Sequence, residues 1–419
     1  CHRLLSELPA DSDVMMDFYL IRSDEHAPAD TTERELQEAL QKAAPPRPLR
    51  RVVVVIAAPQ GDRGISAVQH FTYRLTDGVY SEQKLYRGLH PMMAKRLHLW
   101  RLSNFEIQRL PSVEDVYLFH LLAKTNPKDQ RLYACAEVRN LTPVCDASGK
   151  IVRLPDLEGR LMEALAGMRQ YQSQLPSDQR PMWNRVLLFI WPPLELRPDE
   201  LTELIHKLAA LTEGLDLEQV MVQARMRQSE GGELKDTVLR ISNPGGTGLR
   251  IAAGPPPLYP MRPLSEYDQK IAHMQQQGLT YPYELVRMLT PPRDATTAEF
   301  PPGEFVEHDL GPHGGLVAVS RPPGKNESNI VVGVLRSFTA KHPQGMDRVV
   351  LVGDPSRAMG ALAEPECRRI IAVLELAVVQ SLSVEWFALS VGAKISMDSG
   401  TENMDWISAV LRRIVEFTQ

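Results

Sequence analysis

The chain has 419 residues, of which 43% are hydrophobic, and a formal net charge of −5 at pH 7. Single domains usually contain about 100–200 residues, so this length predicts more than one hydrophobic core. The mild charge, with no run of five like charges, argues against nucleic acid or an anionic membrane as a partner. No apolar run reaches the roughly 20 residues of a membrane helix, and we expect a cytoplasmic protein.

Cysteine usage points the same way. The four cysteines are far apart and include no Cys-x-x-Cys pair: Cys1, Cys135, Cys145 and Cys367. In a chain of this length, such spacing predicts buried free thiols in a reducing compartment and no metal site. The chain begins at Cys1 rather than at Met, and we expect it to be a piece of a longer polypeptide.

The first 90 residues mix strands with a helix. The predicted strands cover residues 14–21, 51–56 and 70–75. The run 51–56 is β-branched and bounded by breakers, so we expect a strand buried on both faces, with 70–75 as its half-exposed neighbour. A capping box formed by Thr32 and Glu35 predicts that a helix starts there.

The next part of the chain continues this mixture. The predicted strands cover residues 115–123, 131–139, 185–191, 217–227, 236–241 and 249–252. The predicted helices cover residues 91–100, 156–174 and 198–211. In the second of these helices one face carries Leu157, Leu161, Leu165 and Met168. We therefore expect an α/β or α+β unit with a sheet of about six strands.

A proline-rich spacer, 254–257, predicts a domain boundary near residue 258. Beyond it, a strand at 349–353, a helix at 364–381 and a strand at 384–389 predict a right-handed parallel crossover. A last helix should run to Phe417. Its buried face is predicted to carry Trp406, Val410, Leu411 and Ile414.

Five C-terminal motifs follow in a familiar order. They are Arg-Pro-Pro-Gly-Lys-Asn-Glu at 321–327, Pro-Gln-Gly-Met-Asp at 343–347, Val-Val-Leu-Val-Gly-Asp at 349–354, Glu-Leu-Ala at 375–377 and Gly-Ala-Lys-Ile at 392–395. Together they resemble the start of the carboxyltransferase domain of the single-chain, multidomain acetyl-CoA carboxylases. Three earlier motifs, at 50–55, 85–91 and 101–107, resemble the last unit of the central region of the same enzymes.

This resemblance implies two domains. Residues 1–257 would be a non-catalytic α/β unit of the central region, and residues 258–419 the truncated front of a crotonase-like ββα carboxyltransferase domain. The implied reaction is carboxyl transfer from carboxybiotin to acetyl-CoA, giving malonyl-CoA for fatty acid biosynthesis. Biotin would be attached elsewhere in the polypeptide, and ATP with Mg or Mn would serve its biotin carboxylase part. The implied partners are the acyl-CoA, the biotin carrier and biotin carboxylase domains of the same chain, and a second copy that pairs through the carboxyltransferase.

The turn after the last predicted strand is the candidate site. Carboxylation at the α-carbon of a thioester passes through an enolate, whose oxygen is stabilised by fixed backbone N–H donors. The resemblance assigns those donors to Gly392 and Ala393, and substrate or CoA binding to Ser390 and Lys394. Lys394 stands where the family has Arg, so it lacks the two-pronged guanidinium, and the acyl chain accepted need not be acetyl.

Two alternatives of other classes stay open. One is a non-catalytic scaffold whose carboxyltransferase-like half has lost activity, and the other is a further crotonase-fold acyl-CoA enzyme such as a hydratase. In the family, the second oxyanion donor and most of the biotin site lie C-terminal to the position that corresponds to Gln419. The chain also has no Met-Lys-Met attachment motif and no ATP-binding loop. We therefore expect this piece to be inactive alone.

Overall fold

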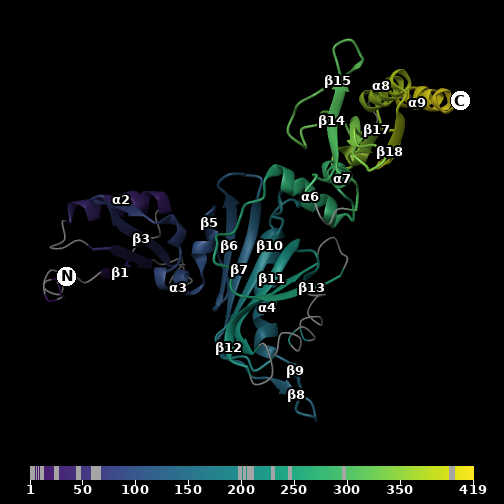
Figure 1. Ribbon diagram of the computed structural model, residues 1–419. Coiled ribbons are helices and arrows are strands. Elements are labelled where there is room, and N and C mark those ends of the chain that lie inside the picture. Colours follow the sequence, from purple (N-terminus) through teal and green to yellow (C-terminus); the bar gives the residue numbers. More distant parts are fainter. Residues whose placement is uncertain are drawn as a thin grey trace. The chain divides into compact units, whose positions relative to one another are not determined.

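The computed structural model (Figure 1) describes residues 5, 7, 9, 14–22, 28–43, 49–57, 68–196, 201, 204, 212–227, 232–243, 248–294, 299–395 and 402–419. They form two compact units, Cys1–Ser265 and Glu266–Gln419, whereas the spacer predicted a boundary near residue 258. Both units combine helices with sheets of parallel and antiparallel strands, so the predicted mixed α/β class is confirmed. Of the predicted helix 198–211, only Leu201 and Leu204 lie within the described residues. No described helix is both long and apolar enough to span a membrane.

The first unit opens with a four-stranded sheet in the order β1-β2-β3-β4. Its elements are β1 (Met15–Ile21), α2 (Ala29–Lys42), β2 (Arg51–Ala57), β3 (Gln69–Thr76) and β4 (Val79–Glu82). β2 pairs with β1 in parallel and with β3 antiparallel, and residues 52–56 are all buried. The strand predicted at 51–56 is therefore confirmed, with both faces covered. β4 was not predicted. It follows a tight turn in which Asp77 and Gly78 have φ values of 51° and 79°, as a two-residue hairpin turn requires.

Helix α2 begins at Ala29, and this corrects the predicted start. Thr32 lies inside the helix, where its hydroxyl donates to the Pro28 carbonyl at 3.3 Å instead of accepting a first-turn N–H. The predicted capping box at Thr32 and Glu35 is wrong. Asp30 provides a negative charge in the first turn, where the helix dipole favours one.

A seven-stranded sheet follows, in the order β13-β12-β11-β10-β7-β6-β5. Its strands are β5 (Phe105–Leu110), β6 (Val116–Ala123), β7 (Gln130–Val138), β10 (Asn184–Ile190), β11 (Leu217–Arg227), β12 (Leu234–Ser242) and β13 (Arg250–Gly254). The remaining elements are η2 (Lys84–Tyr86), α3 (Pro91–Arg96), η3 (Leu99–Leu102), β8 (Val144–Cys145), β9 (Ile151–Arg153), α4 (Pro155–Gln172) and η4 (Ser177–Gln179). One sheet of about six strands was expected. The described residues of the first unit instead form two sheets and the β8-β9 hairpin, because β1 to β4 bury their own core against α2.

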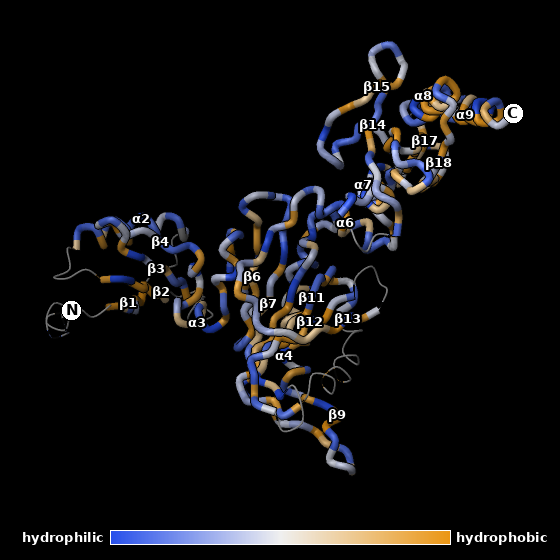
Figure 2. The backbone as a smooth tube through the Cα atoms, in the orientation of Figure 1, coloured by the Kyte–Doolittle hydropathy of each residue, from blue (hydrophilic) through white to orange (hydrophobic). Residues whose placement is uncertain are grey.

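Different helical elements cover the two faces of the seven-stranded sheet. Figure 2 shows hydrophobic residues at intervals along its strands. On one face, α4 buries Leu157, Leu161, Leu165 and Met168, which confirms the predicted stripe. On the other, α3 and η3 cover aromatic residues of β5, β6 and β7. Cys135 is buried there, and burial raises the pKa of its thiol to about 12. Cys367 is also buried. Cys145 is exposed, so the expectation of buried thiols fails for it.

Charged side chains on β7, β10 and β11 form ion pairs, of which Arg131 and its partner Asp129 are buried. Arg131 donates to Asp129 at 2.7 and 2.8 Å and to Glu218 at 3.0 Å, and Arg185 donates to Glu218 at 2.8 Å. Burial raises the pKa of the Glu218 carboxyl, but the hydrogen bond and charge of Arg185, with the charge of Arg131, outweigh it. The pKa of Glu218 therefore lies below its ordinary value.

We expect this pairing to stabilise the first unit in a pH-dependent way. Because the folded-state pKa is lowered, the stabilisation is complete above the ordinary Glu pKa of about 4.3 and is lost as the pH falls below it. Urea unfolding should therefore show Glu218→Gln to be less stable than wild type at pH 6, with the gap narrowing below about pH 4. Glu163→Gln, which alters an exposed pair with Arg160, is the control and should lower the stability at pH 6 by less than Glu218→Gln does.

The second unit is built on a five-stranded sheet in the order β15-β14-β16-β17-β18. Its elements are α6 (Glu266–Gln276), α7 (Pro282–Leu289), β14 (Gly303–Leu310), β15 (Leu316–Ala318), β16 (Ile330–Ser337), β17 (Met346–Gly353), η7 (Ala358–Gly360), α8 (Glu364–Gln380), β18 (Ser383–Phe387) and α9 (Glu402–Thr418). β17 and β18 are parallel and α8 joins them, as predicted. α8 and α9 pack on one core of this sheet, and α7 packs on another. Val410 of α9 is buried, but Leu411 is 58% exposed, so its predicted place on the buried face is wrong.

Candidate functional site

The turn predicted to carry the chemistry follows β18 directly. β18 ends at Phe387, and residues 389–394 run beside η7 and the segment that leads into α8. Leu362 and Ala393 form a parallel bridge, in which the Leu362 N–H donates to the Gly392 carbonyl and the Lys394 N–H donates to the Leu362 carbonyl, both at 2.8 Å. The Val391 N–H reaches the Met359 carbonyl at 3.3 Å. Backbone hydrogen bonds thus fix this turn against the β17-to-α8 connection.

The N–H groups of the two predicted donors differ in their hydrogen bonding. Gly392 has φ +92° and open space where a Cβ would lie, and its N–H donates to the Ser390 Oγ at 3.0 Å. No described residue accepts a hydrogen bond from the Ala393 N–H, and Ala393 is half-buried. Of the two predicted donors, Ala393 is therefore the one whose N–H has no acceptor within the described residues.

Ser390 and Lys394 were the predicted substrate-binding side chains. The Ser390 hydroxyl is engaged within the turn, since it donates to the Gly360 carbonyl at 2.6 Å and accepts from Gly392. Lys394 is exposed, and its carbonyl accepts from the Asn403 amide at 2.9 Å. Within the described residues its ammonium group forms no ion pair. The Ser390 hydroxyl is thus engaged by the turn itself, whereas the described residues show no ion pair for the Lys394 side chain.

Sequence reasoning missed the loop that holds this turn. Ala358, Met359 and Gly360 have φ values of 44°, 53° and 70°, although only glycine adopts this region without strain. A Cβ at Gly360 would lie 2.4 Å from the Leu389 carbonyl oxygen, and a Cβ at Gly353 only 2.1 Å from it. Both glycines are therefore needed for close backbone approach. The sequence signal was the pair of glycines after a buried strand, but only the fold shows what they approach.

Other motif residues of the C-terminal half support the fold. Arg321 donates to Glu307 at 2.8 Å and pairs with Asp309 at 2.8 Å, and Arg369 donates to Asp309 at 2.7 Å. Asp354 is fully buried and accepts from the Asn326 amide at 2.7 Å. These contacts tie the segment before β16 to β14, α8 and the end of β17. The motifs that gave the resemblance thus include many structural residues.

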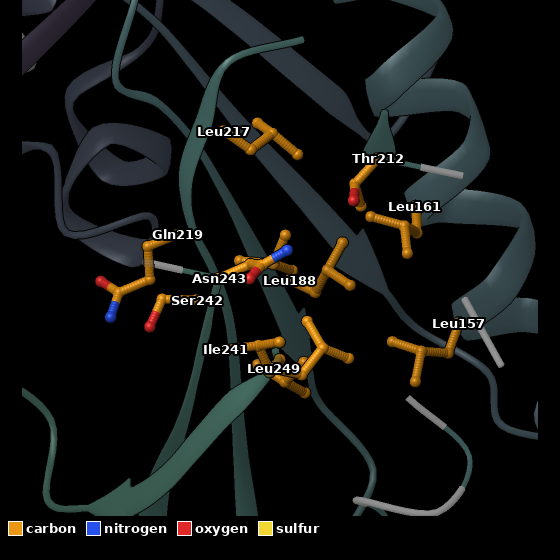
Figure 3. Close-up of a pocket in the computed structure, with 12 residues that line it drawn as sticks. Leu157, Leu161, Leu188, Thr212, Leu217, Gln219, Ile241, Ser242, Asn243 and Leu249 are labelled. Carbon is orange, nitrogen blue, oxygen red and sulfur yellow. The ribbon is translucent and has the colours of Figure 1, made fainter. Parts of the chain in front are cut away.

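An apolar cavity in the first unit is another feature that could hold a ligand (Figure 3). It has a volume of about 60 Å³ and lies between α4 and strands β10 to β12, where leucine side chains point into a shared space. Its polar lining residues are Thr212, Gln219, Ser242 and Asn243. No titratable side chain lines it within the described residues, so it offers no acid, base or nucleophile. Nor do three or more His, Cys, Asp or Glu side chains gather anywhere in the described residues to hold a metal.

The first unit has counterparts among known proteins. Residues 15–218 match the family model of the central region of acetyl-CoA carboxylase. Acetyl-CoA carboxylase of Saccharomyces cerevisiae is 22% identical over 370 residues, covering 76% of this chain, and that of Schizosaccharomyces pombe is 22% identical over 377 residues, covering 78%. Residues 15–218 are therefore similar to the central region of acetyl-CoA carboxylase. The resemblance predicted from the motifs at 50–107 is therefore confirmed.

The extent of this relationship is limited. The chain covers 16% of the length of each of these acetyl-CoA carboxylases. Among solved structures, the crystal structure of the central domain of yeast acetyl-CoA carboxylase aligns with 62% of this chain and 40% of that chain, with 15% identity and a TM-score of 0.41. The similarity to the family model of the acetyl-CoA carboxylase central region covers residues 15–218. A crotonase-like carboxyltransferase domain after these residues stays a prediction.

Proposed function

We propose that this chain joins the non-catalytic central region of a biotin-dependent acyl-CoA carboxylase to the front of its carboxyltransferase domain. The whole enzyme would carboxylate acetyl-CoA to malonyl-CoA for fatty acid biosynthesis in the cytoplasm. The similarity of residues 15–218 to that central region supports the first half of this proposal. The order of the motifs from Arg321 to Ile395 supports the second half.

One observation carries the proposal. A parallel strand-helix-strand unit, β17-α8-β18, ends in a turn of small residues whose Ala393 N–H has no acceptor within the described residues. A backbone donor held rigidly by its neighbours suits an enolate oxygen, because it needs no reorganisation when charge develops. This donor follows a central region in the same chain, as the motif order predicts.

In this proposal, the thioester oxygen of the acyl-CoA accepts from the Ala393 N–H as the α-carbon loses its proton. Carboxybiotin, carried by another domain, would supply the carboxyl group, and its ureido nitrogen, once the bond to that group has broken, would take up the proton from the α-carbon. The Gly392 N–H can bond the substrate only after its hydrogen bond to the Ser390 hydroxyl breaks. Ser390 would therefore control whether this second donor is available. The proposal also includes a biotin carboxylase domain that uses ATP with Mg or Mn, a biotin carrier in the same polypeptide, and a homodimer formed through the carboxyltransferase.

The test is an assay of the longer polypeptide that contains this chain. Biotin-dependent incorporation of labelled bicarbonate is measured with acetyl-CoA, propionyl-CoA and longer acyl-CoAs, and avidin provides the control because it blocks biotin. We expect incorporation into acetyl-CoA. Incorporation only into longer chains would keep the mechanism and change the substrate, whereas none with any acyl-CoA would contradict the enzymatic proposal.

A scaffold is the second candidate, and one observation favours it. The Gly392 N–H, the first of the two predicted donors, is bonded to Ser390 rather than open to a ligand. A carboxyltransferase-like half that only positions other domains would tolerate that arrangement. In the scaffold case, bicarbonate incorporation would fail while the ATP-dependent carboxylation of free biotin by the same polypeptide would persist.

A further inference from the structure

A proline-rich segment follows β13 at the end of the seven-stranded sheet. Residues 255–260 have the sequence Pro-Pro-Pro-Leu-Tyr-Pro and belong to no helix or strand. The ring of a proline fixes φ at about −65° and leaves no N–H to donate. A residue that precedes a proline is also restricted to extended conformations. The sequence itself therefore holds this segment close to a polyproline II conformation.

Both ends of the segment are bonded to the first unit. The Pro255 carbonyl accepts from the Arg240 guanidinium at 3.0 Å. At the other end, the Met261 N–H donates to the Arg101 carbonyl at 2.6 Å, and the Met261 carbonyl accepts from the Asn104 amide at 2.9 Å. The Met261 side chain is buried. The residues between these two anchors are thus presented in a fixed place by a folded unit.

The side chains between the anchors are accessible. Leu258 is 88% exposed and Tyr259 is 65% exposed, while Pro256 and Pro257 are partly exposed. Within the described residues, none of the five residues 256–260 forms a hydrogen bond. Scattered apolar side chains are common on protein surfaces, so exposure alone does not indicate a partner. Here the order of the residue types does.

The exposed residues form a recognition pattern. Pro256, Pro257 and Tyr259 match Pro-Pro-x-Tyr, with Leu258 at the variable position. Because a polyproline II helix has three residues per turn, Pro256 and Tyr259 lie on the same side of it. Domains that bind such segments use grooves lined by aromatic side chains, and the preformed helix loses little conformational entropy on binding. WW domains are the class of these domains that reads two prolines together with a following tyrosine.

We propose that residues 255–260 are a docking site for a WW domain of a partner protein. The prolines pack against the aromatic groove of that domain, and the ring of Tyr259 enters a separate pocket beside the groove. The two anchors favour this binding because they order the segment before the partner arrives. This docking site is independent of the turn at Gly392 and of the reaction proposed for it.

An SH3 domain is the alternative partner, because Pro257, Pro260 and Arg262 match its Pro-x-x-Pro-x-Arg pattern. Met261 argues against it. An SH3 domain would lie along the backbone through Met261, whose N–H and carbonyl are both bonded to the first unit and whose side chain is buried. The residues of the Pro-Pro-x-Tyr pattern all precede that anchor, so a WW domain binds them without breaking it.

Calorimetric titration of the full chain with a purified WW domain that binds Pro-Pro-x-Tyr peptides tests the proposal. We expect binding, and Tyr259→Ala should weaken it at least about tenfold, as for a buried aromatic anchor. Leu258→Ala is the matched control, because it removes the neighbouring and more exposed side chain, and it should leave binding unchanged. Arg262→Ala should also leave it unchanged. A loss with Arg262→Ala but not with Tyr259→Ala would overturn the proposal in favour of the SH3 pattern.

A synthetic peptide of residues 253–262, titrated with the same WW domain, separates the motif from its presentation. We expect the full chain to bind at least as tightly as the peptide, because the bonds at Pro255 and Met261 have already ordered the segment. Urea unfolding should be the same for wild type, Tyr259→Ala and Leu258→Ala, since both side chains are exposed. Binding by the peptide but not by the folded chain, binding by neither, or equal loss in the two variants would each overturn the proposal.

Discussion

Gly392→Pro is expected to abolish carboxyl transfer by the whole enzyme while ATP-dependent carboxylation of biotin continues. The Gly392 φ of +92° is out of reach for proline, whose ring fixes φ near −65°. Proline also lacks the N–H that bonds the Ser390 hydroxyl. The turn must therefore leave its place beside Leu362, and the Ala393 N–H moves with it. Both partial reactions are measured on the same preparation, and the transfer rate should fall at least 100-fold.

Two further variants make this test specific. Gly314→Pro is the matched control, because Gly314 also has a positive φ, +80°, and donates its N–H, but lies in the hairpin between β14 and β15. It should spare most of the transfer activity. Gly392→Ala keeps the N–H and meets no atom within 4 Å, so it should cost only the strain of the positive φ and reduce transfer modestly. Equal loss of both partial reactions in Gly392→Pro would speak against the proposed role of the turn.

The sequence predicted the elements whose signal is local. The run 51–56 and the stripe from Leu157 to Met168 were placed correctly, because each pattern reports burial within one strand or one helix face. β17, α8 and β18 were found for the same reason. The pairing of β17 with β18 followed from the length of the connection, since parallel strands need a long crossover.

The errors arise where distant residues decide the outcome. Nothing within β1 to β4 shows that they form their own sheet, because that depends on a core shared with α2. Leu411 has a helical spacing that suits the buried face of α9, but the packing against α8 reaches Val410 and leaves Leu411 in solvent. At the candidate site, the turn was found from its motif, whereas the bond from Gly392 to Ser390 and the left-handed loop beside it appear only in the fold.

Replacing Asp129 should destabilise the first unit more than any surface change. Asp129 is fully buried and accepts from Arg131 at 2.7 and 2.8 Å, and from the Leu264 N–H at 2.7 Å. In Asp129→Ala, the buried Arg131 guanidinium keeps one of its two ion pairs within the described residues, the 3.0 Å bond to Glu218. Breaking a buried ion pair from one side costs about 3–5 kcal/mol. Urea unfolding should show this loss, with hydrogen exchange rising first in β7 and in the segment around Leu264.

The double variant Asp129→Ala/Arg131→Met shows where that cost arises. When Asp129 and Arg131 are both replaced by apolar residues, no guanidinium is left buried without its Asp129 partner. The double variant should therefore be more stable than Asp129→Ala alone. Glu218 keeps its bonds to Arg185 in either case. The control Glu163→Gln breaks an exposed pair and should cost less than about 1 kcal/mol. If the single and double variants unfold at the same urea concentration, the lost bond to Leu264, rather than the unpaired guanidinium, accounts for the destabilisation.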